Sequence, residues 1–412
     1  MLVYRGDVVL AWGDVERRFK CHSVRKSVLS ALFGTHVAQG RIDIQRTIAD
    51  LGIDDLQPLS ESEKSARVVD LLSARSGVYH LAAKSPSDMS ANLPERGSHA
   101  PGTFWYYNNW DFNTLGTIFE RAAGTSIFDD FTDRFAEPLG MEDWRRRDGY
   151  YELEPRRSRY PAYAFRLSAR DLARFGQLFL QRGRWNGRPI VPESWIDEST
   201  AGHSDLGGGR GYGYMWWIYP AGTMNADHYP TLNRFDKYAA SGTGGQFVLV
   251  VPEAECVFVH RGDTDNNRRV PGRVVWELAE RCIAAKTGEP ESAPKLGPLS
   301  AIPFKNAAAP PPERVAVPLA SESLENYPGR YRVSDALFLE IFAHDGRLFV
   351  DLHHPNGMDE RELVPESQTR FWVVNNPNNT VTFELNAAKV PTGLRFKSGP
   401  VPFKAKRVDP EV

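Results

Sequence analysis

Residues 21–34 read CHSVRKSVLSALFG and contain the pattern Ser-Xaa-Xaa-Lys at Ser23 and Lys26. Apolar residues recur from here at near-helical spacing, which predicts a helix that begins at Ser23 and ends by Gly40. Residues three apart share one face of a helix, so Lys26 would lie close enough to deprotonate the Ser23 hydroxyl. The alternative is that Ser23 only caps the helix and Lys26 is solvated. A second match, Ser292–Lys295, lies in a proline-rich stretch where a helix is disfavoured.

A second pattern of interest is Tyr106-Tyr107-Asn108-Asn109, which follows the turn-forming Pro101-Gly102 and precedes a predicted helix closed by Gly124. A tyrosine whose pKa is lowered by a neighbouring lysine can pass a proton to and from a serine, and an asparagine amide can hold a substrate carbonyl. The alternative is a local hydrogen-bonding turn, because asparagine-rich turns are common.

The third pattern is Ser-Gly-Thr-Gly-Gly-Gln at residues 241–246, which leads into FVLVV and, after a turn, into CVFVH. The two apolar runs predict a buried hairpin. Glycines at a strand entry let a ligand approach the backbone closely, so the N–H groups near Gly244 and Gly245 are candidates for binding an oxyanion. The alternative is a bulge or tight strand start that needs glycine.

Taken in order, these three patterns resemble the β-lactamase and penicillin-binding serine hydrolase family. The resemblance covers about residues 1–288 and is closest to the branch that contains class C β-lactamases, related esterases and 6-aminohexanoate-dimer hydrolases. It implies an α/β (α+β) domain in which an antiparallel sheet is flanked by helices. The stretches PGTFWYYNNWDFNTLG and LSARDLARFGQLFL are similar to the family as well.

The resemblance also implies roles for individual residues. Ser23 would be the nucleophile, Lys26 its base partner and Tyr107 the proton shuttle. Tyr107 is preferred to Tyr106 because its spacing to Leu115-Gly116 is more similar to the family. Asn109 would complete the Tyr-Xaa-Asn motif and contact the substrate. We therefore predict acyl transfer to Ser23.

The third motif departs from the β-lactamases, which have Lys-Thr-Gly there and use its cation to bind the substrate carboxylate. Residues 241–244 contain no cation, so we expect carboxylic esters or small amides to be better substrates than β-lactams. The literal Lys286-Thr287-Gly288 is predicted to end a helix instead. Arg166 or Arg261 could supply the missing charge.

Several aromatic residues lie near the motifs, and we predict that some form an apolar wall for the substrate, with packing in the core as the alternative. The two that we assign to substrate binding are Trp216 and Trp217, and the others are Trp105, Trp110 and Tyr214.

Two other functions stay open. A D-amino-acid peptidase or penicillin-binding cell-wall enzyme would need a site for a charged peptide end. A non-catalytic binding or sensor protein on the same fold would fill the three motifs without turnover. Neither Gly-Xaa-Ser-Xaa-Gly nor a zinc-site spacing of Cys and His occurs, so a Ser-His-Asp elbow and a metal site have no support. We predict no cofactor.

The chain divides by composition into three parts. Residues 1–288 would form the hydrolase-like domain. Residues 289–319 would form a linker, because eight prolines lie between Pro290 and Pro318. Residues 320–412 alternate apolar and polar positions around turns such as His344-Asp345-Gly346, which predicts a small all-β domain. This tail resembles the lipocalin-like barrel appended to some of these hydrolases.

The composition limits the partners. In 412 residues, 50 Lys and Arg oppose 52 Asp and Glu, so no global positive field would attract nucleic acid or an anionic membrane. No apolar run is long enough for a membrane span. Three cysteines favour a reducing compartment, and Arg5 and Asp7 interrupt the apolar stretch that a secretory signal needs, so we expect a cytoplasmic location. The expected partner is a small ester or amide, and the oligomeric state stays open.

Overall fold

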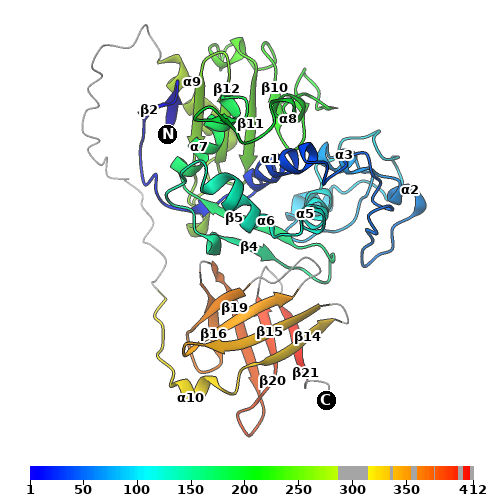
Figure 1. The fold of residues 1–412 in the computed structure, drawn as a ribbon, viewed down its shortest axis with the longest axis vertical. Coiled ribbons are helices and arrows are strands. Elements are labelled where there is room, and N and C mark those ends of the chain that lie inside the picture. Colours follow the sequence, from blue (N-terminus) through cyan, green and yellow to red (C-terminus); the bar gives the residue numbers. More distant parts are fainter. Residues whose placement is uncertain (286–313, 335–336, 354–359, 375, 398–401, 409–412) are drawn as a thin grey trace.

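The computed structural model describes residues 1–285, 314–334, 337–353, 360–374, 376–397 and 402–408. Residues 1–285, here called the N-terminal part, contain a large antiparallel sheet with helices on its faces (Figure 1). The predicted fold class is confirmed. No helix among the described residues has both the length and the apolar character needed to cross a bilayer.

The large sheet has eight strands in the order β2-β1-β13-β12-β11-β10-β9-β8. Their bounds are β1 (Leu2–Tyr4), β2 (Asp7–Leu10), β8 (Ser204–Asp205), β9 (Gly211–Tyr212), β10 (Trp217–Tyr219), β11 (Lys237–Gly242), β12 (Gln246–Val251) and β13 (Cys256–His260). The predicted hairpin is β12–β13, with Phe247 opposite His260 and Val251 opposite Cys256. Strands from both ends of this part therefore meet in one sheet.

A small sheet lies beside it, in the order β3-β5-β4, with β3 (Phe19–Lys20), β4 (Gly149–Glu152) and β5 (Ala162–Leu167). A two-stranded hairpin joins β6 (Arg184–Trp185) to β7 (Arg188–Pro189). The helices of this part are α1 (Val24–Ala38), α2 (Glu61–Lys64), α3 (Val68–Leu72), α4 (Ser87–Ala91), α5 (Asn109–Ala123), α6 (Ile127–Phe131), α7 (Ala169–Leu180), α8 (Glu193–Ser199) and α9 (Gly272–Ala284). Helix α1 crosses between the large sheet and the region of α3 and α5 (Figure 1).

Helix α7 packs with its apolar face against the large sheet. Its apolar face, which includes Leu172, Phe175 and Phe179, is buried. Gly176 faces the sheet so closely that a Cβ there would lie 2.5 Å from Val257 Cγ1. Glycine is therefore required for this helix to contact the strands, and the contact closes the core beneath β12 and β13.

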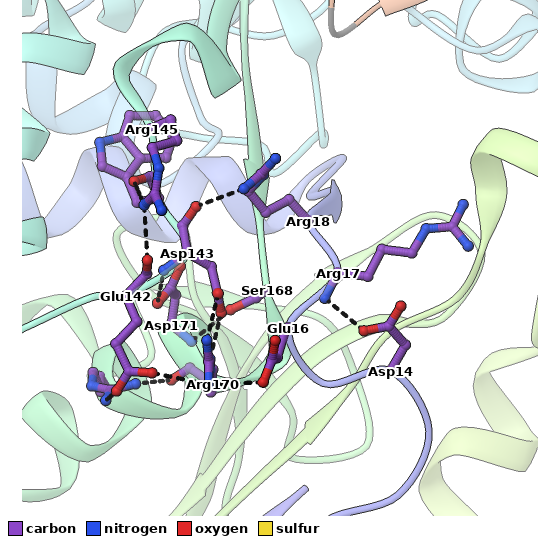
Figure 2. Close-up of polar contacts among 12 residues, drawn as sticks. Asp14, Glu16, Arg17, Arg18, Glu142, Asp143, Arg145, Ser168, Arg170 and Asp171 are labelled. Atoms are coloured by element: carbon purple, nitrogen blue, oxygen red, sulfur yellow. Dashed lines mark hydrogen bonds and ion pairs between the residues drawn. The ribbon is translucent and has the colours of Figure 1, made fainter. Parts of the chain in front are cut away.

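The chain segment that leads to β3 is fixed by a polar network around the start of α7 (Figure 2). Ser168 caps the helix by accepting from the Asp171 amide at 3.0 Å. Arg170 binds both carboxylate oxygens of Asp143 at 2.6 and 2.7 Å, and Arg18 donates to the Asp143 carbonyl at 3.1 Å. Arg18 lies two residues before Lys20, so the network holds the approach to Ser23.

The tail forms a closed barrel of eight antiparallel strands, β14 to β21, preceded by α10 (Ser321–Leu324). The strands are β14 (Gly329–Ser334), β15 (Leu337–His344), β16 (Arg347–His353), β17 (Glu360–Pro365), β18 (Arg370–Val373), β19 (Asn376–Leu385), β20 (Pro391–Lys397) and β21 (Phe403–Val408). Asp345 and Gly346 form the predicted turn, with φ of 50° and 69°. The all-β tail is thus confirmed.

Most of the predicted linker, and also Ser292–Lys295 and Lys286-Thr287-Gly288, lies outside the described residues. The domain boundaries at 288 and 320 therefore stay predictions. The barrel contacts the N-terminal part at β4, where Arg361 donates to the carbonyls of Arg147 and Gly149.

Candidate active site

Ser23 lies at the sharp turn between β3 and α1. The Cys21 amide donates to the Phe165 carbonyl at 2.8 Å and so ends the small-sheet pairing. His22 then adopts a left-handed conformation with φ of 47°, and α1 begins at Val24. The N-terminus of a helix carries partial positive charge, which favours negative charge that develops nearby. Ser23 is therefore positioned where an alkoxide or oxyanion is stabilised.

The Lys26 amine contacts three of the predicted site residues. Its Nζ lies 3.1 Å from Ser23 Oγ, 2.6 Å from the Tyr107 hydroxyl and 2.8 Å from Asn109 Oδ1. Lys26 is only 2 % exposed. Burial, and secondarily the charge of Arg25, lowers the pKa of Lys26 well below its usual value. The structure thus brings Ser23, Lys26, Tyr107 and Asn109 together around one amine.

The orientation of Asn109 follows from its second partner. Asn108 caps α5 by accepting from the Trp110 amide, so Asn109 occupies the first turn of the helix. Asn109 Nδ2 donates to the Lys84 carbonyl at 3.0 Å. Because a carbonyl only accepts, the amide nitrogen faces Lys84 and the amide oxygen faces Lys26.

The two tyrosines of the motif point to different places. The Tyr107 hydroxyl hydrogen-bonds with Ser23, and its ring stacks on Trp217 with centroids 5.4 Å apart. Tyr106 instead donates to the Met89 carbonyl at 2.7 Å. The expected low pKa for the tyrosine is wrong, because burial raises the pKa of Tyr107 to about 12 while the Ser23 hydrogen bond only partly opposes it. Tyr107 is therefore a neutral phenol at physiological pH.

Strand β11 passes directly over the Ser23 amide. A Cβ on Gly242 would lie 3.0 Å from Ser23 N and 2.6 Å from the Cys21 carbonyl, so only glycine fits. Gly244 and Gly245 lie farther along the turn, and both line the same cavity as Ser23. The backbone contact with the Ser23 turn is made by Gly242 and not by the predicted pair, Gly244 and Gly245. Gly242 lies in the sequence motif, and a glycine at the end of a strand was the sequence feature that could have indicated this contact.

The cavity beside Ser23 has a volume of about 340 Å³. Tyr107, Trp217 and Gln246 line it together with Trp276 from α9. None of its lining residues carries a charge.

The position of Trp216 requires a correction. Trp216 is fully buried and packs against Phe179 and Tyr238, with ring centroids 4.5 and 5.4 Å away. It belongs to the core and does not line the cavity, so its predicted contact with substrate is wrong. Trp216 immediately precedes β10, whose first residue, Trp217, lines the cavity.

The two arginines considered as substitutes for the missing cation have protein partners. Arg166 binds Asp265 through two contacts, of 3.1 and 2.5 Å. Arg261 donates to the Phe19 carbonyl at 2.6 Å and contacts Cys21 Sγ. Within the described residues, no group of three or more His, Cys, Asp and Glu side chains could hold a metal ion.

Comparisons with known proteins agree on the fold of the N-terminal part. The chain is 24 % identical over 295 residues to the 6-aminohexanoate-dimer hydrolase of Paenarthrobacter ureafaciens, covering 63 % of this chain and 70 % of that protein. It superposes with a TM-score of 0.52 on a putative 6-aminohexanoate-dimer hydrolase from Bacillus anthracis, at 22 % identity and with coverage of 69 % and 77 %.

The octameric penicillin-binding protein homologue from Pyrococcus abyssi matches almost the whole chain, with 98 % of this chain and 94 % of that one, a TM-score of 0.50 and 17 % identity. Residues 313–409 match a domain of unknown function, DUF3471. Residues 1–268 match the family model "Beta-lactamase". The chain therefore belongs to the beta-lactamase family.

Proposed function

We propose that the protein is a serine hydrolase that acts through an acyl-enzyme on carboxylic esters or small amides. The observation that carries the proposal is the Lys26 amine within hydrogen-bond distance of Ser23 Oγ, the Tyr107 hydroxyl and Asn109 Oδ1. A buried amine with a lowered pKa is available as a neutral base.

The hydrogen-bond count favours Ser23 as the proton donor to Lys26. A neutral amine has two N–H donors and one lone pair. Asn109 Oδ1 accepts one of the N–H bonds because its amide nitrogen is committed to Lys84. With the second N–H directed to Tyr107, the lone pair is left for the Ser23 hydroxyl proton.

In the acylation step, Ser23 Oγ attacks the substrate carbonyl carbon while its proton passes to Lys26 Nζ. The bond from the carbonyl carbon to the leaving oxygen or nitrogen then breaks. The leaving atom takes a proton from the Tyr107 hydroxyl, which is replenished from Lys26. Because the Tyr107 pKa is about 12, the phenol relays a proton without resting as a phenolate.

Deacylation reverses these roles with water as the nucleophile. Water attacks the acyl carbon and gives a proton to the Tyr107–Lys26 pair, and Ser23 Oγ recovers a proton as its bond to carbon breaks. The Ser23 amide and the backbone between Gly242 and Gly245 border the position of the oxyanion, with the N-terminus of α1 adding favourable charge.

The character of the cavity supports the proposed substrates. An uncharged lining that includes Trp217, Phe247 and Trp276 favours an uncharged, partly apolar group. A β-lactam carboxylate, or the charged end of a peptide, would find no opposite charge in this lining. Similarity to a 6-aminohexanoate-dimer hydrolase is the reason to include amides.

The test combines covalent labelling with turnover. A fluorophosphonate should add to the wild type at Ser23, as located by peptide mass spectrometry, and p-nitrophenyl butyrate should be hydrolysed. Ser23→Ala should remove both signals with an unchanged circular dichroism spectrum, because only one oxygen is lost. Labelling at another serine would overturn the nucleophile, and no turnover of any ester or amide would favour a binding or sensor protein.

A further inference from the structure

A buried carboxylate, Glu152, is connected to the candidate active site through Lys84. Glu152, at the end of β4, accepts from Lys20 Nζ with both oxygens at 2.7 Å, and Lys84 Nζ lies 3.5 Å from Oε1. The Glu152 side chain is 6 % exposed. Burial alone would raise its pKa, but the charges of Lys20 and Lys84 outweigh burial and lower the pKa of Glu152 to about 2. Glu152 is thus ionised throughout the physiological range.

Lys84 links this carboxylate to the catalytic amine. Its backbone has a left-handed φ of 59°, which is unfavourable for a lysine. In this conformation the Lys84 carbonyl accepts from Asn109 Nδ2, while the Lys84 side chain is held toward Glu152. The ion pair, the left-handed backbone and the contact with Asn109 therefore all belong to one residue.

We propose that Glu152 is a positioning residue of the proposed hydrolase. Its carboxylate holds Lys84, the Lys84 carbonyl fixes the Asn109 amide, and Asn109 Oδ1 directs Lys26 Nζ toward Ser23 and Tyr107. The inference rests on the proposed function, because it assigns to Glu152 an effect on the reactivity of Ser23.

The barrel also contacts β4, the strand that carries Glu152. Leu153, the residue after Glu152, is buried within the apolar cluster of the barrel. At the other end of β4, Arg361 donates to the carbonyls of Arg147 and Gly149 and lies over the Tyr150 ring at 5.0 Å. Both ends of the strand that presents Glu152 are therefore held by the barrel, so Arg361 is expected to support the same positioning.

The main test is Glu152→Gln, which preserves the shape of the side chain and removes its charge. Lys20 from β3, Lys84 and Arg25 from α1 are the cations that face the carboxylate, and the variant leaves them without its compensation. We expect the rate of fluorophosphonate labelling at Ser23, and kcat for p-nitrophenyl butyrate, to fall about 10–100-fold with KM changed less than about threefold, since small misplacements of catalytic groups have effects of this size.

A matched control comes from the barrel. Glu384 also faces two cations, Arg395 at 2.8 Å and Lys404 at 3.9 Å, but its side chain is 41 % exposed and both partners belong to the barrel. Glu384→Gln should leave the labelling rate and kcat within about twofold of wild type. An equal fall in both variants would mean a general effect of charge and would overturn the proposal.

Two further variants keep the test decisive if Glu152→Gln does not fold. Lys84→Met retains the carbonyl but frees it from the ion pair, and Arg361→Met loosens β4 from the barrel side. Both variants should lower kcat, and Lys84→Met should lower it more than Arg361→Met. The double variant Lys84→Met with Glu152→Gln should be no slower than the slower of its two single variants. The labelling is measured at least 15 °C below each unfolding midpoint, so that loss of folded protein does not contribute.

The possible failures are distinguishable. If wild-type Ser23 is not labelled, the proposed function fails. If wild type is labelled and folded Glu152→Gln or Lys84→Met is labelled equally fast, the function stands and the positioning role of Glu152 is overturned.

Discussion

Two cavities in the N-terminal part, one beside Ser23 and one beside Lys237, differ more in the chemistry of their linings than in volume. The first has about 340 Å³ and no charged residue in its lining. The second is larger, about 420 Å³, and four charged residues line it: Arg182, Asp197, Asp236 and Lys237. Volume alone would therefore select the cavity that lacks the hydrolase motifs.

Each cavity adjoins a lysine that is 2 % exposed, Lys26 in the first case and Lys237 in the second. Lys237 Nζ donates to two backbone carbonyls, those of Phe235 at 2.8 Å and Tyr219 at 3.3 Å. Carbonyls accept hydrogen bonds but cannot return a proton. Lys26 instead contacts two hydroxyl groups, which both donate and accept. A buried amine becomes a candidate base through the partners that exchange protons with it.

Replacing Lys26 is expected to have the largest effect. Lys26→Met should lower kcat/KM for p-nitrophenyl butyrate by about 10³–10⁴-fold, because the base for Ser23 is lost. Lys26→Arg should be about as inactive, since a guanidinium stays protonated. Steady-state kinetics and fluorophosphonate labelling measure both. Activity within tenfold of wild type in either variant would contradict the role of Lys26.

Tyr107→Phe is expected to follow, with a fall of about 10²–10³-fold in kcat. Tyr106→Phe is the matched control, because that hydroxyl donates to the Met89 carbonyl and should change kcat less than about threefold. Combining Tyr107→Phe with Lys26→Met should add little to the Lys26 effect, since the two act as one unit. The reverse ranking of the tyrosines would show that Tyr106 is the shuttle.

These contacts also show which parts of the fold and of the candidate site can be predicted from the sequence. Spacing was sufficient to predict α1, α5 and the β12–β13 hairpin, because their apolar periodicity is strong. It could not separate Trp216 from Trp217, since the burial of Trp216 depends on its packing against the distant residues Phe179 and Tyr238. Nor did any motif indicate Glu152 or Lys84. They act through an ion pair and a backbone carbonyl, and such contacts between distant segments leave no local pattern.

The absence of charge in the lining of the Ser23 cavity predicts a preference for esters over β-lactams, with an effect smaller than that of the Lys26 and Tyr107 variants. We expect kcat/KM for p-nitrophenyl butyrate to exceed that for nitrocefin by at least about 10–100-fold, the effect of a missing charge-assisted hydrogen bond to the lactam carboxylate. Gly242→Lys is unsuitable as a gain-of-function test, because a side chain there would collide with the Ser23 turn. Comparable values for the two substrates would show that lactams are recognised without a cation in the third motif.

The pH dependence tests the titration states directly. Below the lowered pKa of Lys26, kcat/KM should fall about tenfold per pH unit, because protonation removes the base. No alkaline decline should come from Tyr107 below about pH 11, since its pKa is about 12. His22 should not set the acidic limb near neutrality, because burial, with the charge of Lys20, lowers its pKa to about 4. A profile that declines above pH 8–9 would contradict a neutral Tyr107.

The smallest effect is expected at Lys237, where the comparison of the two lysines is tested most directly. Lys237→Met should change kcat/KM less than about twofold, because the amine contacts no residue of the Ser23 cavity and separated sites act independently.

The substitution of Lys237 should instead change how the free energy of unfolding depends on pH. Burial lowers the pKa of Lys237 to about 8, whereas an unfolded lysine titrates near about 10.4. Between these values the unfolded chain binds one more proton than the folded chain, so the free energy of unfolding of the wild type gains a contribution that rises with pH. Urea unfolding from pH 7.5 to 10.5 should show this rise in the wild type relative to Lys237→Met, and the difference should level off below pH 8. If Lys237→Met lowered kcat tenfold with this stability difference absent, partner chemistry would not distinguish the two lysines.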